Sequence, residues 1–242
     1  DGINGISAYD AALVLQHAVG NSTLSGYAAT AADINKSGAI TALDAYYILQ
    51  KAVDLITLPF PGAGVVWTFD PPSRSYGVLS ANQSAQDFTA LLLGDVSGNW
   101  SAGGQASGVS VPGAQLTLVE GAAQDDTITL QVHLNSRVPI YSLEFSALFA
   151  MDAFAALEPD LTALTQGWLI SSNRNEPGRL RVAMAGVQPF SGDGAVLNLR
   201  FHSTQGQQQV NAILQEARAD EVSLALPQSE QRIFIPLVAN SR

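Results

Sequence analysis

Four oxygen-bearing side chains are regularly spaced along a short stretch near the N-terminus. Asp33, Asn35 and Ser37 occupy alternate positions, and Asp44 is the twelfth residue counted from Asp33. Gly38 follows the alternating residues, and glycine permits the sharp turn that such a loop needs. Alternating oxygens, a central glycine and a closing acid are typical of an EF-hand-type loop, which binds calcium through oxygen ligands. The predicted calcium ligands are Asp33, Asn35, Ser37, the Ala39 carbonyl and Asp44.

The loop and the helix expected after it occur a second time, earlier in the chain. Asp10 aligns with Asp44, and the apolar helix sequence that follows each acid is repeated, which marks an internal duplication. In this earlier copy Asp1 is only the third loop position, and Ile3 stands at the fifth without a side-chain oxygen. We expect a weaker calcium site from Asp1, the Gly5 carbonyl and Asp10, and the sequence leaves its occupancy open.

A third stretch again alternates oxygen-bearing side chains, at Asp95, Ser97 and Asn99. It lacks the glycine and the closing acid at the positions where a full loop would have them. Two interpretations stay open: the stretch is the front half of a further calcium loop, or it is a turn capped by its own side chains. In the first case its oxygens would complete the incomplete first loop.

Composition excludes several classes of function. The chain of 242 residues has 21 Asp and Glu against 11 Lys and Arg, a net charge of -10. This balance argues against nucleic acid or an anionic membrane surface as a partner. The chain contains no cysteine, so disulfides and thiolate metal sites are excluded. No apolar run approaches the roughly 18 to 20 residues of a membrane-spanning helix.

The hydrophobic period predicts a chain of helical and β-rich parts, an α+β multidomain fold. After each loop, apolar residues recur at the spacing of a helix, whereas beyond the Gly-, Ser- and Ala-rich linker at Ala102–Ser110 the period changes to two. Strands are predicted at 115–119, 127–134, 141–149, 180–185 and 195–202, which favours an antiparallel β-sandwich. The expected parts are a calcium module at 1–58, an ordered extension and linker at 59–106, a sandwich at 107–226 and a tail strand at 227–242.

The N-terminal part resembles a type I dockerin over about residues 1–58. The resemblance rests on the duplicated loop and helix, the Asp at the end of each loop, and Ala-rich helices ending Leu-Gln-x-Ala-Val. It implies a small module that folds around calcium and docks onto a cohesin. The resemblance also implies that the tenth and eleventh loop residues contact the partner, and these are Ala8 and Tyr9 in one copy and Ala42 and Leu43 in the other.

The β-rich part is similar in its order of strands and turns to a cohesin, over about residues 107–226. The matching segments include Met151-Asp152, the strand and turn at 178–186, and Phe190–Gly194. The similarity implies a nine-stranded jelly-roll whose flat face binds a dockerin. The apolar tail is either the last strand of its own domain, with Pro236 placing it at an edge, or a strand exported to a neighbouring subunit.

No residue pattern indicates catalysis. The three histidines are scattered, and no nucleophile elbow, zinc motif or phosphate-binding glycine loop occurs. The acidic neighbours Asp125-Asp126 and Glu216, Asp220 and Glu221 are expected to be solvated turn acids. Asn21 and Asn82 are candidate glycosylation sites, because each begins an Asn-x-Ser/Thr triplet.

These observations lead to a non-enzymatic, calcium-dependent extracellular assembly protein. Its subunits would join head to tail through dockerin–cohesin-type contacts into a filament or scaffold, since a heterologous contact that does not close makes a filament. Its partners would be other copies of itself or other cohesin- or dockerin-bearing proteins. The alternative is a fragment of a cell-surface scaffold or carbohydrate-binding protein that recruits other proteins or polysaccharide.

Overall fold

The computed structural model describes residues 5–102, 110–207 and 209–226. Three helices form the N-terminal module: α1 (Ala8–Ala18), α2 (Gly26–Ala32) and α3 (Ala42–Ala52). The first and third begin with the same capping box, in which a hydroxyl residue and an acid three positions later bond to each other's backbone. The two predicted helices are thus confirmed, and the short α2 between them was not predicted.

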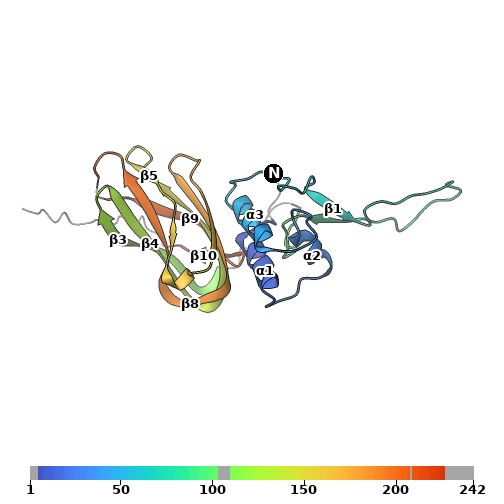
Figure 1. The fold of residues 1–242 in the computed structure, drawn as a ribbon, viewed down its shortest axis with the longest axis horizontal. Coiled ribbons are helices and arrows are strands. Elements are labelled where there is room, and N and C mark those ends of the chain that lie inside the picture. Colours follow the sequence, from blue (N-terminus) through green and yellow to red (C-terminus); the bar gives the residue numbers. More distant parts are fainter. Residues whose placement is uncertain (1–4, 103–109, 208, 227–242) are drawn as a thin grey trace, which may run out of the picture.

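The extension after the helices contributes both to the core of this module and to a projecting arm. Phe60, Leu93 and Val96 are buried in one apolar cluster with the helices. Between them, β1 (Trp67–Asp70) and β2 (Thr89–Leu92) form an antiparallel two-stranded ribbon. In Figure 1 the chain between these two strands extends away from the rest of the molecule.

The remaining strands form a two-layered β-sandwich. They are β3 (Ser110–Gln124), β4 (Thr127–Phe149), β5 (Phe154–Ala156), β6 (Asp160–Leu161), β7 (Leu169–Asn173), β8 (Arg179–Ser203), β9 (Ala212–Ala219) and β10 (Val222–Ala225), with a 3-10 turn at Ala163–Thr165 between β6 and β7. The order in the sheet is β3-β10-β9-β4-β8-β5. Every described pairing in the sandwich is antiparallel except that of β10 with β3.

The two longest strands run through both layers. The predicted strands 127–134 and 141–149 are one continuous β4, and 180–185 and 195–202 are one continuous β8. The reason is that each strand bends at irregularities of the β4–β8 register, including the one between Ser136 and Ile140, instead of reversing at a turn. The sandwich itself, predicted from the alternating pattern, is confirmed, and one continuous core of buried apolar residues fills it.

The helical module lies directly against the sandwich (Figure 1). Ala183 and Ala185 of β8 belong to the same apolar cluster as the buried residues of α1 and α3. Partly buried Tyr141, Leu169 and Val187 pack against this cluster from the sandwich side. Among the described residues no helix is long and apolar enough to cross a membrane. The predicted tail strand, most of the predicted linker and Asp1 lie outside the described residues.

Candidate functional site

The second loop gathers the predicted calcium ligands at the start of α3. The backbone N–H of Ser37 lies 2.9 Å from Asp33 Oδ1 and 2.9 Å from Asn35 Oδ1. The N–H of Gly38 donates to Asp33 Oδ2 at 2.9 Å, and Gly38 has the positive φ of 86° that glycine adopts at little cost. The side chains of Asp33 and Asn35 therefore already surround one turn of backbone.

Asp44 closes this loop with one carboxylate oxygen that lacks a donor. Its Oδ2 accepts hydrogen bonds from the N–H and the hydroxyl of Thr41, both at 2.9 Å. Its Oδ1 is buried, and none of the described residues donates to it. A buried carboxylate oxygen without a partner is unfavourable, so this position fits a bound cation.

The donor set of the second loop suits calcium, which prefers oxygen ligands. The residues that would hold the ion are Asp33, Asn35, Ser37, Asp44 and the carbonyl of Ala39. The ion supplies the positive charge that neutralises the two carboxylates. Within the described part of the chain no group of three His, Asp or Glu side chains converges as a metal site. To bind calcium, the second loop would therefore need its amide, hydroxyl and carbonyl oxygens in addition to its two carboxylates.

The first loop has the same capping geometry but a different neighbour. Asp10 Oδ2 accepts the backbone N–H of Ser7 at 2.8 Å, as Asp44 does from Thr41. Asp10 Oδ1, however, accepts the backbone N–H groups of Val96 and Ser97 at 2.8 and 2.9 Å. The structure thus brings the third predicted stretch to the first loop, where the sequence analysis expected it to supply oxygen ligands. The contact that it makes there is through amide donors.

The Asp95–Asn99 stretch is also held by its own first side chain. The carboxylate of Asp95 accepts the N–H groups of Asn99 at 3.0 Å and Trp100 at 3.1 Å. Asp33 holds the N–H groups of Ser37 and Gly38 in the same way, so this geometry fits both interpretations of the stretch, a turn capped by its own side chain and the front half of a calcium loop. The hydroxyl of Ser97 donates to Glu221 Oε1 at 2.9 Å, so this side chain points toward the sandwich.

The two predicted partner-contact pairs lie in different surroundings. Ala8 is buried, and its N–H donates to Glu144 Oε2 of β4 at 3.2 Å, while the partly buried Tyr9 packs on the cluster that joins the module to the sandwich. Ala42 and Leu43 at the start of α3 are exposed, with Leu43 at 50%. One copy of the duplication is therefore in contact with the sandwich of its own chain, and the other faces solvent.

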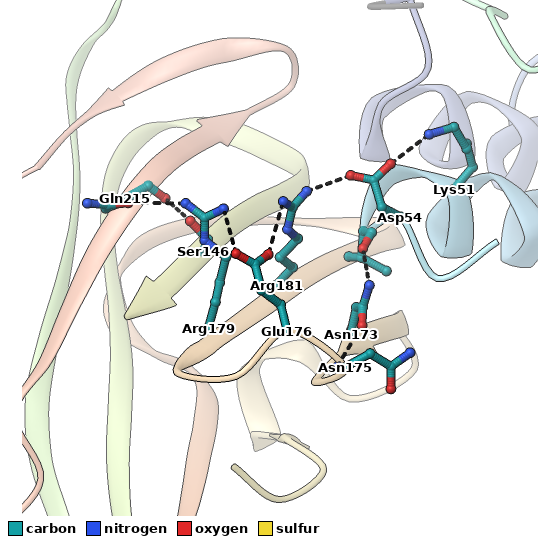
Figure 2. Close-up of polar contacts among 10 residues, drawn as sticks. Lys51, Asp54, Ser146, Asn173, Asn175, Glu176, Arg179, Arg181 and Gln215 are labelled. Atoms are coloured by element: carbon teal, nitrogen blue, oxygen red, sulfur yellow. Dashed lines mark hydrogen bonds and ion pairs between the residues drawn. The ribbon is translucent and has the colours of Figure 1, made fainter. Parts of the chain in front are cut away.

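We call the region where the helical module contacts the sandwich the junction. Polar contacts add to it along α1 and beyond the end of α3. Gln16 of α1 donates its side-chain amide to the Val187 carbonyl at 2.6 Å. Asn173 of β7 donates to the Val53 carbonyl at 2.9 Å. Figure 2 shows the ion pairs beside this bond, in which Asp54 pairs with both Lys51 and Arg181. Exposed ion pairs contribute little, so the apolar cluster is the main source of stability at this junction.

The duplicated loops and helices coincide with a known domain. Residues 3–52 match the family Dockerin type I domain. The predicted dockerin-like module is therefore confirmed. A search of curated proteins finds no match to the chain.

The β-rich part is similar to solved cohesins. One is the sixth cohesin of scaffoldin B from Acetivibrio cellulolyticus, solved in complex with a dockerin, at 16% identity over 48% of this chain and 94% of that chain, with a TM-score of 0.40. A second is a non-cellulosomal cohesin from Archaeoglobus fulgidus, at 19% identity over 46% and 84% of the two chains, with a TM-score of 0.38. A third is a cohesin–dockerin complex from Clostridium thermocellum, at 12% identity over 47% and 94%, with a TM-score of 0.39.

Sequence reasoning missed the acids that line the junction between the dockerin module and the sandwich. The prediction that Asp220 and Glu221 are solvated turn acids is wrong, because both are partly buried here. They form the two-residue turn between β9 and β10 with φ of 47° and 67°, a backbone conformation that side chains other than Gly, Asn and Asp rarely adopt. Glu221 reaches the hydroxyl of Ser7 at 2.9 Å, and Asp220 accepts the N–H of Ser142 at 2.8 Å.

Several carboxyl groups at this junction have raised pKa values. Burial, and then the charge of Glu221, raise the pKa of Asp10 to about 8. Burial also raises the pKa of Glu144, although Arg218 opposes the shift through an ion pair at 3.4 Å. Burial is the largest cause of the raised pKa of Asp220, and hydrogen bonds from Ser142 and Tyr141 oppose it.

The raised pKa values of Glu144 and Asp220 predict a junction that weakens as pH rises. Each folded carboxyl keeps its proton above the pH at which the unfolded chain has lost it, so the folded chain binds more protons there. The free energy of unfolding therefore falls with pH between the ordinary carboxyl pKa, about 4, and the raised pKa. Denaturation of the full chain at a series of pH values in saturating calcium measures this slope.

Asp220→Asn provides the matched variant for the pH series. The Asn side chain keeps an oxygen for the hydrogen bonds to Ser142 and tolerates positive φ, but it does not titrate. The slope of stability against pH should be smaller than in the unmodified chain. An identical slope would show that Asp220 does not contribute to the pH dependence.

Proposed function

We propose that this chain is a non-enzymatic extracellular assembly protein whose subunits join through the contact between dockerin module and sandwich. The observation that carries the proposal is the apolar cluster that α1 and α3 share with Ala183 and Ala185 of β8. One chain therefore contains two mutually complementary surfaces. A dockerin module followed by a cohesin-like fold supports a role in protein–protein assembly. Dockerin modules are typical of secreted and cell-surface proteins, which supports the extracellular location.

The same contact can be made within one chain or between two chains. When the module of one subunit docks on the sandwich of the next, the contact is heterologous, and repetition produces a head-to-tail filament. The same two surfaces are in contact in the closed single chain and in the filament, so the free energy of this contact largely cancels when the two states are compared. The intramolecular contact has an effective concentration on the order of millimolar, and assembly requires either a comparable subunit concentration or further contacts.

Exposed apolar side chains on the second copy offer such further contacts. Leu43 is 50% exposed and Tyr46 is 40% exposed, and both lie at the start of α3. Leu43 occupies one of the positions predicted to contact a partner. Burying these side chains against a neighbouring subunit would favour the assembled state over the closed chain, since apolar burial contributes about 25 cal/mol per Å².

Calcium would control the assembly through Asp44, which both closes the second loop and caps α3. Without the ion, the carboxylates gathered in this loop repel one another, so the folded module is less stable. The docking surface of α3 depends on that folded module. Calcium dependence of assembly is therefore part of the proposal.

Electron microscopy of the purified chain in millimolar calcium, and again after chelation, tests the proposal. We expect filaments or extended chains of subunits in calcium and their loss after chelation. Leu43→Asp should reduce assembly without loss of the folded monomer, since this side chain is exposed in the closed chain. Monomers that persist in calcium would overturn the self-assembly proposal. If those monomers bound a separate cohesin or a polysaccharide, they would favour the recruiting scaffold.

A further inference from the structure

The two copies of the duplicated loop can be compared directly at their closing acids. Asp10 and Asp44 are both fully buried, and each accepts two hydrogen bonds on Oδ2 from the hydroxyl residue three positions earlier. The two closing acids differ in the donors to Oδ1. In Asp44 this atom has no donor among the described residues, whereas in Asp10 it has two.

The donors at Asp10 occupy the position in front of Oδ1 where a cation would bind. They are the backbone N–H groups of Val96 and Ser97, at 2.8 and 2.9 Å. Their hydrogens carry partial positive charge and point at the oxygen, so they would repel a metal ion at the same place. Each oxygen of Asp33 accepts only one backbone N–H and keeps a lone pair for a cation, whereas Asp10 Oδ1 accepts two, which occupy both of its lone pairs. Val96 is 5% exposed and belongs to the module core, which fixes the segment there.

Gly5 provides independent evidence that the segment around Val96 and Ser97 packs against the first loop. A Cβ atom at Gly5 would lie 2.7 Å from the Cβ of Trp100 and 3.0 Å from the Cγ of Asp95. Only glycine therefore fits at position 5 while the segment is in place. The equivalent residue of the second copy is Ala39, whose side chain is accommodated there.

We infer that the first loop is not a calcium site, and that the peptide segment at Val96 and Ser97, through its two backbone N–H groups, takes the place of the ion at Asp10. The dockerin module then binds one calcium ion, at the second loop. The peptide also connects three parts of the chain, because Ser97 reaches Glu221 of the sandwich turn through its hydroxyl. The first half of the module would be held in place by the chain's own backbone and would not depend on calcium.

Native mass spectrometry and calcium titration of the full chain test this inference. We expect one tightly bound ion in the unmodified chain and none in Asp44→Ala. Asp10→Ala should still bind one ion, with affinity changed less than about threefold, since a change of that size is under 1 kcal/mol. Two bound ions in the unmodified chain, or loss of an ion in Asp10→Ala, would overturn it.

Hydrogen exchange keeps the test decisive if Asp10→Ala fails to fold. In the calcium-loaded, unmodified chain, the amides of Val96 and Ser97 should exchange as slowly as those inside α1. Gly5→Ala should speed their exchange while the calcium stoichiometry stays at one. Fast exchange at both amides in the unmodified chain would contradict the inference. All these measurements are made on dilute monomer, so a failure to form filaments does not affect them.

Discussion

Asp44→Ala is expected to remove calcium binding and to destabilise the dockerin module. The substitution deletes the buried Oδ1, which has no donor among the residues that the structure describes, and also the Oδ2 that caps α3. In the unmodified chain, calcium at about 100 times its Kd should add about 2.7 kcal/mol to the free energy of unfolding. The variant should lose this increment, and loss of the cap should remove about 1 kcal/mol more. Thermal denaturation with and without calcium, followed by circular dichroism of the helices, measures both effects.

Asp87→Ala is the matched control for charge. Asp87 is an exposed acid on the projecting arm, far in sequence from both loops, and its removal changes the net charge equally. Its calcium-induced rise in Tm should equal that of the unmodified chain. If Asp44→Ala kept the full rise in Tm, the assignment of the second loop as the calcium site would be wrong.

Ala185→Glu is expected to separate the dockerin module from the sandwich. Ala185 is fully buried in the cluster that joins the two, and it pairs with Ser142 of β4 and Leu169 of β7. A carboxylate buried there without a partner would cost roughly 3–5 kcal/mol. Release of the module exposes the new side chain to water, so the sandwich itself should stay folded. Small-angle X-ray scattering should show a larger radius of gyration, and filaments should be lost.

Two further variants show whether the larger radius of gyration and the loss of filaments result from disruption of the junction. Ala155→Glu introduces the same charge at an exposed position of β5 and should leave the radius of gyration unchanged. Arg181→Ala removes the ion pair with Asp54 across the junction, and with it the pair with Glu176 inside the sandwich, and should weaken the junction by only about 0.2–1 kcal/mol. A compact Ala185→Glu chain that still assembles would contradict the docking contact as the basis of assembly.

The sequence marks the second loop because its information is local, and its assignment as a calcium site stays a prediction. Asp33, Asn35, Ser37 and Asp44 lie within one short stretch, and their spacing alone indicates the geometry that the structure has. The alternating period likewise predicts the sandwich. The continuity of β4 and β8 could not be predicted, since a bend and a turn both interrupt the alternation in the same way.

The contacts of the first loop could not be predicted because they are formed by backbone and by distant residues. Val96 and Ser97 act through their N–H groups, which every residue except proline has, so no residue type marks them. Glu221 reaches Ser7 across more than 200 positions of sequence. The one local sign was Gly5 in place of Ala39, and its meaning depends on knowing that Trp100 lies beside it.

Mechanical load would reach the sandwich by a defined route. The dockerin module packs on Ala183 and Ala185, in the part of β8 that is paired with β4 on one side and β7 on the other. The pairing with β4 continues along nearly the whole length of both strands, through both layers. A pull on the module is therefore shared by many backbone hydrogen bonds of a central strand. In a filament of such subunits, tension would be carried by the best-connected strands of the fold.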